Sequence, residues 1–85
     1  MIRRSKLEYK IVVLKTATEP MLITTLMETT SIRHKILKPI VDGFIRSGLM
    51  TATPMTGYPR LVMLKTTAKG LELVRTYESV VERLA

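Results

Sequence analysis

The sequence predicts a small α+β domain, mostly helical, in which three helices are followed by two β-strands and a fourth helix. Apolar residues recur at helical spacing in four segments, which is the pattern of amphipathic helices. Two short strand-like runs lie between the third and fourth segments, separated by turn-forming residues. Because a chain of 85 residues is one domain at most, we expect a single domain over 1–85, with a core unit at 5–70 and a last helix at 68–84.

The first helix is expected over about residues 6–16. Ser5 precedes its apolar pattern and Glu8 follows three residues later, which is the capping-box arrangement of a helix N-terminus. The polar residues at 16–19 end the pattern. This segment therefore predicts one short amphipathic helix.

Pro20 is expected to be the first residue of the second helix, where its missing N–H has no helical partner to lose. An apolar face continues from there to Glu28, and the polar residues 29–31 end the helix. The β-branched residues at 23–25 leave a strand open as an alternative.

The third helix has the broadest apolar face. Thr30 or Ser31 is expected to cap its N-terminus and Gly48 to end it. Its apolar positions are Ile36, Leu37, Ile40, Val41, Phe44 and Ile45. Pro39 lies inside this pattern and removes the hydrogen bond to the Lys35 carbonyl, at a cost of about 3 kcal/mol. We expect a kink between these two residues, or a split helix whose second segment begins at Pro39.

Residues 49–53 and 61–65 are expected to pair as a β-hairpin. Residues 54–60 contain turn formers at both ends and a central glycine, so they predict an extended tip. Thr66 or Thr67 then caps the fourth helix.

Two motifs resemble those of a known group of proteins. Residues 37–49 resemble the recognition-helix ending L-x-x-x-V-x-x-L-x-x-x-G-L of MarR-like, PadR-like and small archaeal winged-helix regulators. The residues at the matching positions are Leu37, Val41, Phe44, Gly48 and Leu49. Residues 64–70 are similar to the L-T-x-x-G junction that follows the wing in these proteins. The resemblance covers essentially residues 5–80 and implies a winged helix-turn-helix fold that binds double-stranded DNA.

Helix-turn-helix docking places the exposed N-terminal residues of the third helix in the major groove. The candidate contacts there are Thr30, Ser31, Arg33, His34, Lys35 and Lys38. Tyr58 and Arg60 at the hairpin tip are further candidates, because a wing arginine gains from the negative potential of the minor groove. Arg3, Arg4, Lys6 and Lys10 form a basic N-terminus that reaches phosphates or merely aids solubility. The alternative for the helix is a solvated charged face, and for Tyr58 a ring packed over the hairpin.

The charge balance favours a polyanionic partner. The net charge is +7, and it is unevenly distributed. Residues 1–70 carry 12 basic and 4 acidic side chains, a balance of +8, whereas residues 71–85 carry 2 and 3, a balance of −1. A basic body with a nearly neutral C-terminal segment predicts that the body binds nucleic acid and that the segment has another task.

Several function classes are disfavoured. The chain has no cysteine and one histidine, so we expect no disulfide, no metal site and no cofactor. No phosphate-binding glycine loop or acid–base pair is present, so we expect no enzyme. No run is long and apolar enough for a membrane span or a signal peptide, so we expect no membrane partner and an intracellular, cytoplasmic location.

The fourth helix predicts a dimer. Leu73, Tyr77, Val80 and Leu84 follow the spacing of a helix-pairing seam. A second stripe, formed by Leu71, Val74 and Val81, is expected to pack on the core. Because a domain this small is marginally stable alone, we expect a C2 homodimer through residues 71–84 with help from the first helix. The alternative is a monomer in which the same helix makes a wide internal contact.

Two further interpretations stay open. One is a chromatin-type protein that binds DNA without sequence preference, and the other is a winged helix used for protein–protein contacts. DNA is favoured if Arg33, Lys35, Lys38, Arg60 and the N-terminal arginines share one surface, and a protein partner is favoured if they are scattered. No small-molecule ligand is evident from the sequence.

Overall fold

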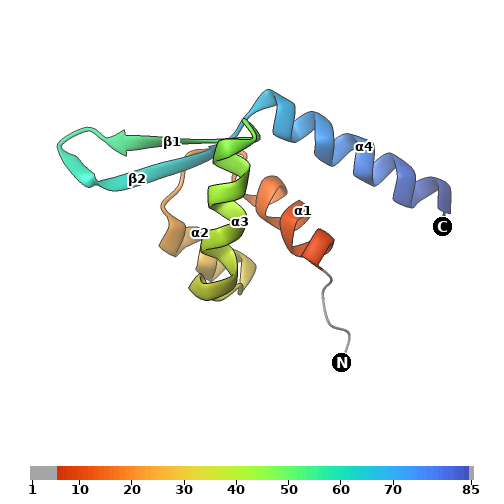
Figure 1. Cartoon of the computed structure of the whole chain (residues 1–85), viewed down its shortest axis with the longest axis horizontal. Helices are drawn as coiled ribbons and strands as arrows, with labels where there is room; N and C mark the ends of the chain where they lie inside the picture. The colour runs from red at the N-terminus through yellow and green to blue at the C-terminus, as the bar shows by residue number, and fades with distance from the viewer. Residues whose placement is uncertain (1–5, 85) are drawn as a thin grey trace.

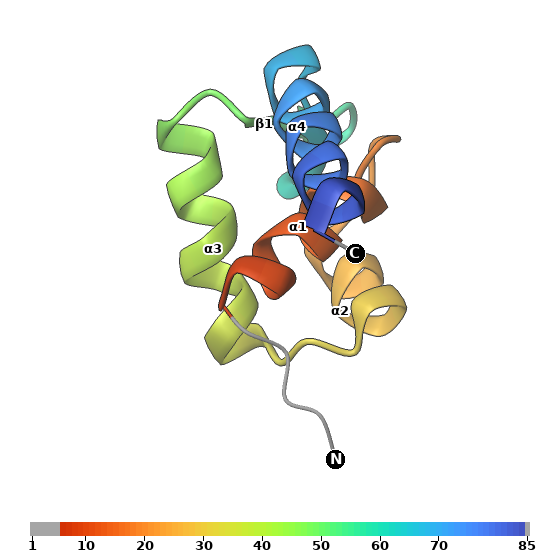
Figure 2. The same ribbon diagram turned by 90° about the vertical axis from the view of Figure 1, so that its right-hand side faces the viewer.

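The computed structural model describes residues 6–84 and has the predicted order of helices and strands. The elements are α1 (Lys6–Thr16), α2 (Ile23–Thr30), α3 (His34–Arg46), β1 (Met50–Met55), β2 (Tyr58–Thr66) and α4 (Ala68–Leu84). In Figure 1 the hairpin projects from one side of the helical body and α4 from the other. The same arrangement seen end-on in Figure 2 shows α1 between α3 and α2. The predicted α+β class, mostly helical, is confirmed.

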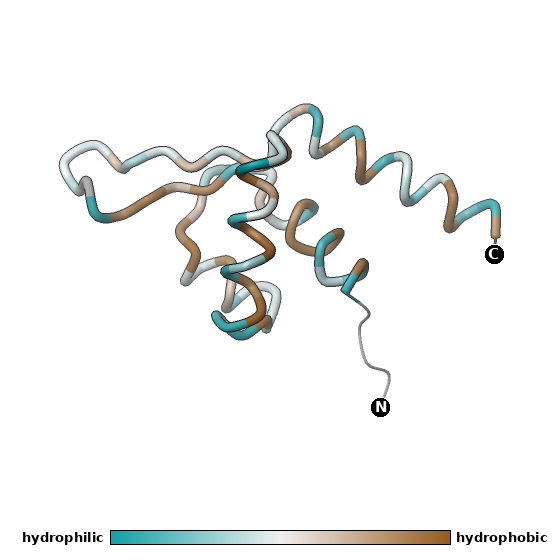
Figure 3. Tube along the Cα trace, viewed as in Figure 1, coloured by the Kyte–Doolittle hydropathy of each residue, from teal (hydrophilic) through white to brown (hydrophobic). Residues whose placement is uncertain are grey.

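The core lies among α1, α2 and α3, and it is closed by the first residue of β1, by β2 and by the first half of α4. Its buried apolar side chains are Ile11, Val13, Leu14, Ala17, Leu26, Ile32, Leu37, Val41, Phe44, Met50, Leu64 and Val74. Figure 3 shows hydrophobic and hydrophilic residues alternating along α3 and α4, as expected for helices that bury one face. None of the helices within 6–84 has the length and apolar character needed to cross a bilayer.

The second helix begins later than the sequence predicts. Pro20 lies outside α2, and Met21 instead forms a bridge with Leu64 of β2. The Met21 N–H donates to the Leu64 carbonyl at 3.0 Å, and the Leu64 N–H donates back at 2.7 Å. The preference of Pro20 for a helix start therefore yields to pairing with a distant strand. Residues 23–25 are helical, so the strand alternative for them is wrong.

The predicted caps of the third helix are also wrong. Thr30 belongs to α2, where its hydroxyl donates to the Leu26 carbonyl at 2.7 Å and accepts from the Ile32 N–H at 3.3 Å. Ser31 ends α2 in the left-handed conformation, with φ of 58°. The residue before α3 is Arg33, which makes no side-chain capping bond. Thr30 and Ser31 therefore terminate one helix and do not start the next.

Helix α3 is not split at Pro39: it is one helix from His34 to Arg46 with the proline inside it. Leu37 and Val41, on either side of Pro39 in the sequence, are both buried in the core. Pro39 itself is exposed. The burial of these two side chains therefore offsets the cost of the single hydrogen bond that Pro39 removes near the start of the helix.

The hairpin is longer and its turn tighter than predicted. Strand β1 pairs antiparallel with β2 from Met50↔Thr66 to Met55↔Tyr58, so residues 54–60 are not a loop. The turn is reduced to Thr56 and Gly57, and Gly57 has φ of 83°, a conformation that glycine adopts without strain. The register shifts between Pro54 and Met55. Such bulges strengthen the twist of a hairpin and redirect its side chains.

Thr67, one of the two predicted caps, starts α4. Its hydroxyl accepts a hydrogen bond from the Gly70 N–H at 3.2 Å and donates to the Gly48 carbonyl at 2.7 Å. The other candidate, Thr66, is the last residue of β2. Gly48 has φ of 76° and follows the end of α3, as expected for a glycine stop. Thr67 therefore links the segment between α3 and β1 to the first turn of α4.

Candidate nucleic-acid interface

Helix α3 turns one face into the core and the other to solvent. Leu37, Val41 and Phe44 anchor the inner face. The exposed cationic and imidazole side chains at its start are Arg33, His34, Lys35 and Lys38. Residues four apart on a helix lie one above the other, so His34 and Lys38 share one flank of α3. Lys35 is rotated away from them.

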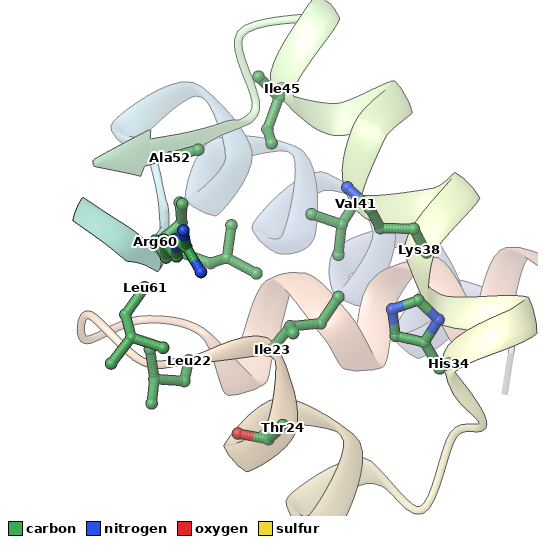
Figure 4. Close-up of a pocket in the computed structure, with 12 residues that line it drawn as sticks. Leu22, Ile23, Thr24, His34, Lys38, Val41, Ile45, Ala52, Arg60 and Leu61 are labelled. Carbon is green, nitrogen blue, oxygen red and sulfur yellow. The ribbon is translucent and has the colours of Figure 1, made fainter. Parts of the chain in front are cut away.

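His34 and Lys38 line a cleft together with Arg60 of β2. The cleft has a volume of about 390 Å³ and lies between α2, α3 and the hairpin. In Figure 4, His34 and Lys38 extend from α3 on one side, Arg60 lies on the opposite side, and Ile23 and Val41 lie between them. The apolar residues that line the cleft are Leu22, Ile23, Val41, Ile45, Ala52, Leu61, Val62 and Leu64. We name this site the α3–hairpin cleft.

Lys35 lies on the other flank of α3. It lines a separate groove between α1 and α3, together with Lys6 and Lys10 of α1. The candidate cations of the third helix therefore do not all share one surface. Lys38 and Arg60 meet at the α3–hairpin cleft, whereas Lys35 faces a different set of lysines.

The remaining candidates occupy different environments. Thr30 is 4% exposed and its hydroxyl is engaged within the fold, so it offers no side chain to a ligand. Ser31 is exposed beside it. Tyr58 is 62% exposed at the start of β2, so its ring lies largely in solvent. Arg3 and Arg4 lie outside the described residues.

Asp42 is a component of the site that sequence reasoning missed. Its carboxylate pairs with the Lys38 ammonium at 2.8 Å, one turn away on α3, and both side chains are about half exposed. The spacing of four residues between Lys38 and Asp42 is visible in the sequence and indicates this pair. Asp42 therefore competes with any anion that approaches Lys38. Within residues 6–84, no group of three or more potential ligands is placed to hold a metal ion.

The predicted dimer seam on α4 is mostly exposed. Leu73, Val80 and Leu84 are 43%, 50% and 82% exposed. Leu73, Tyr77 and Val80 line an apolar groove of about 270 Å³ between α1 and α4, to which Leu7 and Ile11 contribute from α1. We name it the α1–α4 groove.

The second stripe of α4 packs on the core only in part. Val74 is buried and Leu71 is half-buried, whereas Val81 is 46% exposed. The expectation that Val81 packs on the core of its own chain is therefore wrong. The reason is that the last turns of α4 extend beyond the body of the domain, as Figure 1 shows.

Comparisons with known proteins identify the fold. No protein-family profile and no curated protein sequence matches the chain. Among solved structures, the transcriptional regulator BldR from Sulfolobus solfataricus is similar, with a TM-score of 0.77 over 88% of this chain and 21% sequence identity. The matched region is 55% of BldR, so this chain spans about half of that protein's length. The chain therefore has the winged helix-turn-helix fold, with α2 and α3 as the helix-turn-helix and β1–β2 as the wing.

Proposed function

We propose that this chain is the DNA-binding domain of a non-enzymatic transcriptional regulator. In the proposed complex, α3 enters the major groove of double-stranded DNA and the wing follows the backbone or the minor groove. The observation that carries the proposal is the α3–hairpin cleft, where Lys38 of α3 and Arg60 of the wing line the same site. The likeness to a transcriptional regulator supports the same class of function.

The residues of the cleft suit a duplex. Lys38 and Arg60 donate hydrogen bonds only, so they fit phosphate oxygens and guanine acceptors. His34 can donate to or accept from a base edge. Apolar groups nearby, such as Leu61 at 42% exposure, match the thymine methyl group. The net charge of +7 attracts the polyanion over a longer range.

A homodimer through the α1–α4 groove completes the proposal. Leu7 and Val80 are each about half exposed there, and the described residues that line the groove are mostly apolar. A second copy that covers this surface buries apolar area. This burial stabilises a domain whose small size makes it only marginally stable alone. A C2 pair then presents two α3 helices to successive turns of the major groove, about 34 Å apart.

The test is fluorescence anisotropy of a labelled mixed-sequence duplex at several salt concentrations. Lys38→Gln and Arg60→Gln are each expected to weaken binding and to lower the slope of log affinity against log salt by about 0.9 for each phosphate that the wild-type side chain neutralises. Arg75→Gln, on the exposed surface of α4, is the matched control and should leave the slope unchanged. No binding at low salt, or an equal weakening by the control, would refute the proposal.

Sequence-specific regulation and nonspecific chromatin binding differ in a second measurement. The protein first selects its preferred site from a pool of randomised duplexes. The affinity for the selected duplex divided by the affinity for an unselected duplex gives the specificity ratio. A regulator is expected to bind its selected site at least about a thousandfold more tightly than unselected DNA. A ratio near one indicates the chromatin-type alternative.

A further inference from the structure

The groove between α1 and α3 is lined by three cations that lie outside the α3–hairpin cleft. It lies on the flank of α3 opposite the wing and has a volume of about 510 Å³. Lys6 and Lys10 line it from α1, and Lys35 lines it from α3. We name it the α1–α3 groove.

The three lysines have no counter-charge among the described residues that line the groove. None of them forms an ion pair with another described residue, and none of the described residues that line the groove is Asp or Glu. Lys6 and Lys10 lie four residues apart and so stack one above the other on α1, with Lys35 across the groove. Three cations around one concave surface repel each other, and an acidic ligand removes that repulsion.

Between the lysines the groove is apolar. Tyr9 of α1 and Ile36, Pro39 and Ile40 of α3 line it, and Ile36 is 39% exposed although its neighbour Leu37 is fully buried. A phosphate backbone gains nothing from such side chains. An apolar surface bordered by cations matches a helix that has apolar residues on one face and acidic residues beside them.

From the charge complementarity and the apolar lining, we propose that the α1–α3 groove docks an acidic amphipathic helix of a partner protein. The partner segment has apolar side chains at spacings of three and four residues, flanked by Asp or Glu. The site is separate from the α3–hairpin cleft. The proposal does not depend on DNA binding.

The probe is a fluorescein-labelled amphipathic peptide of about 15 residues, long enough for partial helicity, with leucines on one face and glutamates beside them. The full chain is titrated with it. Lys10→Glu and Lys35→Glu are each expected to lower the affinity about tenfold, which corresponds to loss of one favourable charge pair. Lys65→Glu makes the same charge change on the exposed surface of β2, outside the groove, and should leave the affinity within about twofold.

Site mapping and two peptide controls complete the test. The methyl resonances of Ile36 and Ile40 should shift on binding, and peptides with lysine in place of glutamate or serine in place of leucine should bind more weakly. Absence of binding, methyl shifts confined to other residues, or an equal loss of affinity in Lys65→Glu overturns the proposal. Circular dichroism confirms that each variant is folded.

Two other ligands of the α1–α3 groove, DNA and a second copy of this chain, would give different results. If DNA occupies the groove, Lys10→Glu weakens duplex binding as strongly as Arg60→Gln does, and this outcome overturns the proposal. If a second copy occupies it, Lys35→Glu abolishes the self-association of the wild-type protein, which also overturns the proposal. Lys35 is the residue to change because Lys10 lines the α1–α4 groove as well. Failure of peptide binding with normal duplex binding refutes this inference and leaves the proposed function standing.

Discussion

The carboxylate of Asp42 accepts a hydrogen bond from the ammonium of Lys38 at 2.8 Å, on the exposed surface of α3, the helix that we propose enters the major groove. The pair is half exposed, so it contributes little to stability, about 0–1 kcal/mol. Its consequence is electrostatic: an anion that approaches Lys38 must displace the carboxylate or tolerate its charge.

Asp42→Asn is therefore expected to raise the affinity for a duplex by a few fold, about 0.5–1 kcal/mol. The reason is that Lys38 is released and a negative charge is removed from the proposed interface. Duplex anisotropy at constant salt measures the change. Glu72→Gln, which removes one negative charge from the exposed surface of α4, is the control and should have a smaller effect. Weaker binding by Asp42→Asn would show that Asp42 contacts a base directly.

Gly70 lies where the start of α4 meets the hairpin. A Cβ there would clash with the carbonyl oxygen of Leu49 and lie 2.6 Å from Cγ2 of Thr66. Because a backbone carbonyl cannot rotate away, Gly70→Ala is expected to lower the free energy of unfolding by about 1–3 kcal/mol. Urea denaturation measures it.

Gly43 is the matched control for this substitution. It is helical, and a Cβ added there meets nothing within 4 Å. Gly43→Ala should therefore raise the free energy of unfolding by about 0.5–1 kcal/mol, because alanine loses less conformational freedom in a helix. The two substitutions should have opposite signs. Destabilisation by both would mean that the environment of Gly43 is tighter than the structure shows.

Thr66 joins the hairpin to α1. Its buried hydroxyl donates to the Leu14 carbonyl at 2.8 Å, and its N–H donates to the Ala17 carbonyl at 2.7 Å. Thr66→Val keeps the shape but removes the hydroxyl, so we expect a loss of about 1–3 kcal/mol in the free energy of unfolding. Thr51→Val is the control, because the exposed Thr51 hydroxyl makes only a long bond of 3.4 Å. Similar losses from both substitutions would contradict the importance of the Thr66–Leu14 bond.

Val80→Asp tests the proposed dimer. The carboxylate would enter the apolar α1–α4 groove, and burying an unpaired charge in an interface is strongly unfavourable. We expect wild-type protein to sediment as a dimer at micromolar concentration and the variant as a monomer. Ser79→Asp adds the same charge one residue away, outside the residues that line the groove, and should remain dimeric. A monomeric wild-type protein would refute the dimer.

Local patterns in the sequence predicted most of the elements. The end of α1 at Thr16, the broad apolar face of α3, the stop at Gly48 and a cap of α4 at Thr66 or Thr67 were all predicted from neighbouring residues. The predicted cap of α1, Ser5, lies outside the described residues. These features depend on interactions within one or two turns, so the chain that surrounds them has little influence.

Two features that depend on contacts between elements were predicted wrongly. Pro20 carries a helix-start signal, yet the segment pairs through Met21 with Leu64, because backbone groups beside a strand gain two hydrogen bonds there. Residues 54–60 carry loop signals, yet five of them lie in β1 and β2. In both places the local preference was overridden by pairing with a strand.

The candidate site divides in the same way. Helical spacing by itself determines that Lys38 lies one turn above His34 and that Lys35 points elsewhere. Only the tertiary structure decides that Arg60 lines the same cleft as His34 and Lys38. It also decides that Lys6 and Lys10 line the same groove as Lys35. The physical reason is that helical periodicity determines the direction in which each side chain leaves α3. The packing of α1 and of the wing against α3 determines which residues lie next to that side chain.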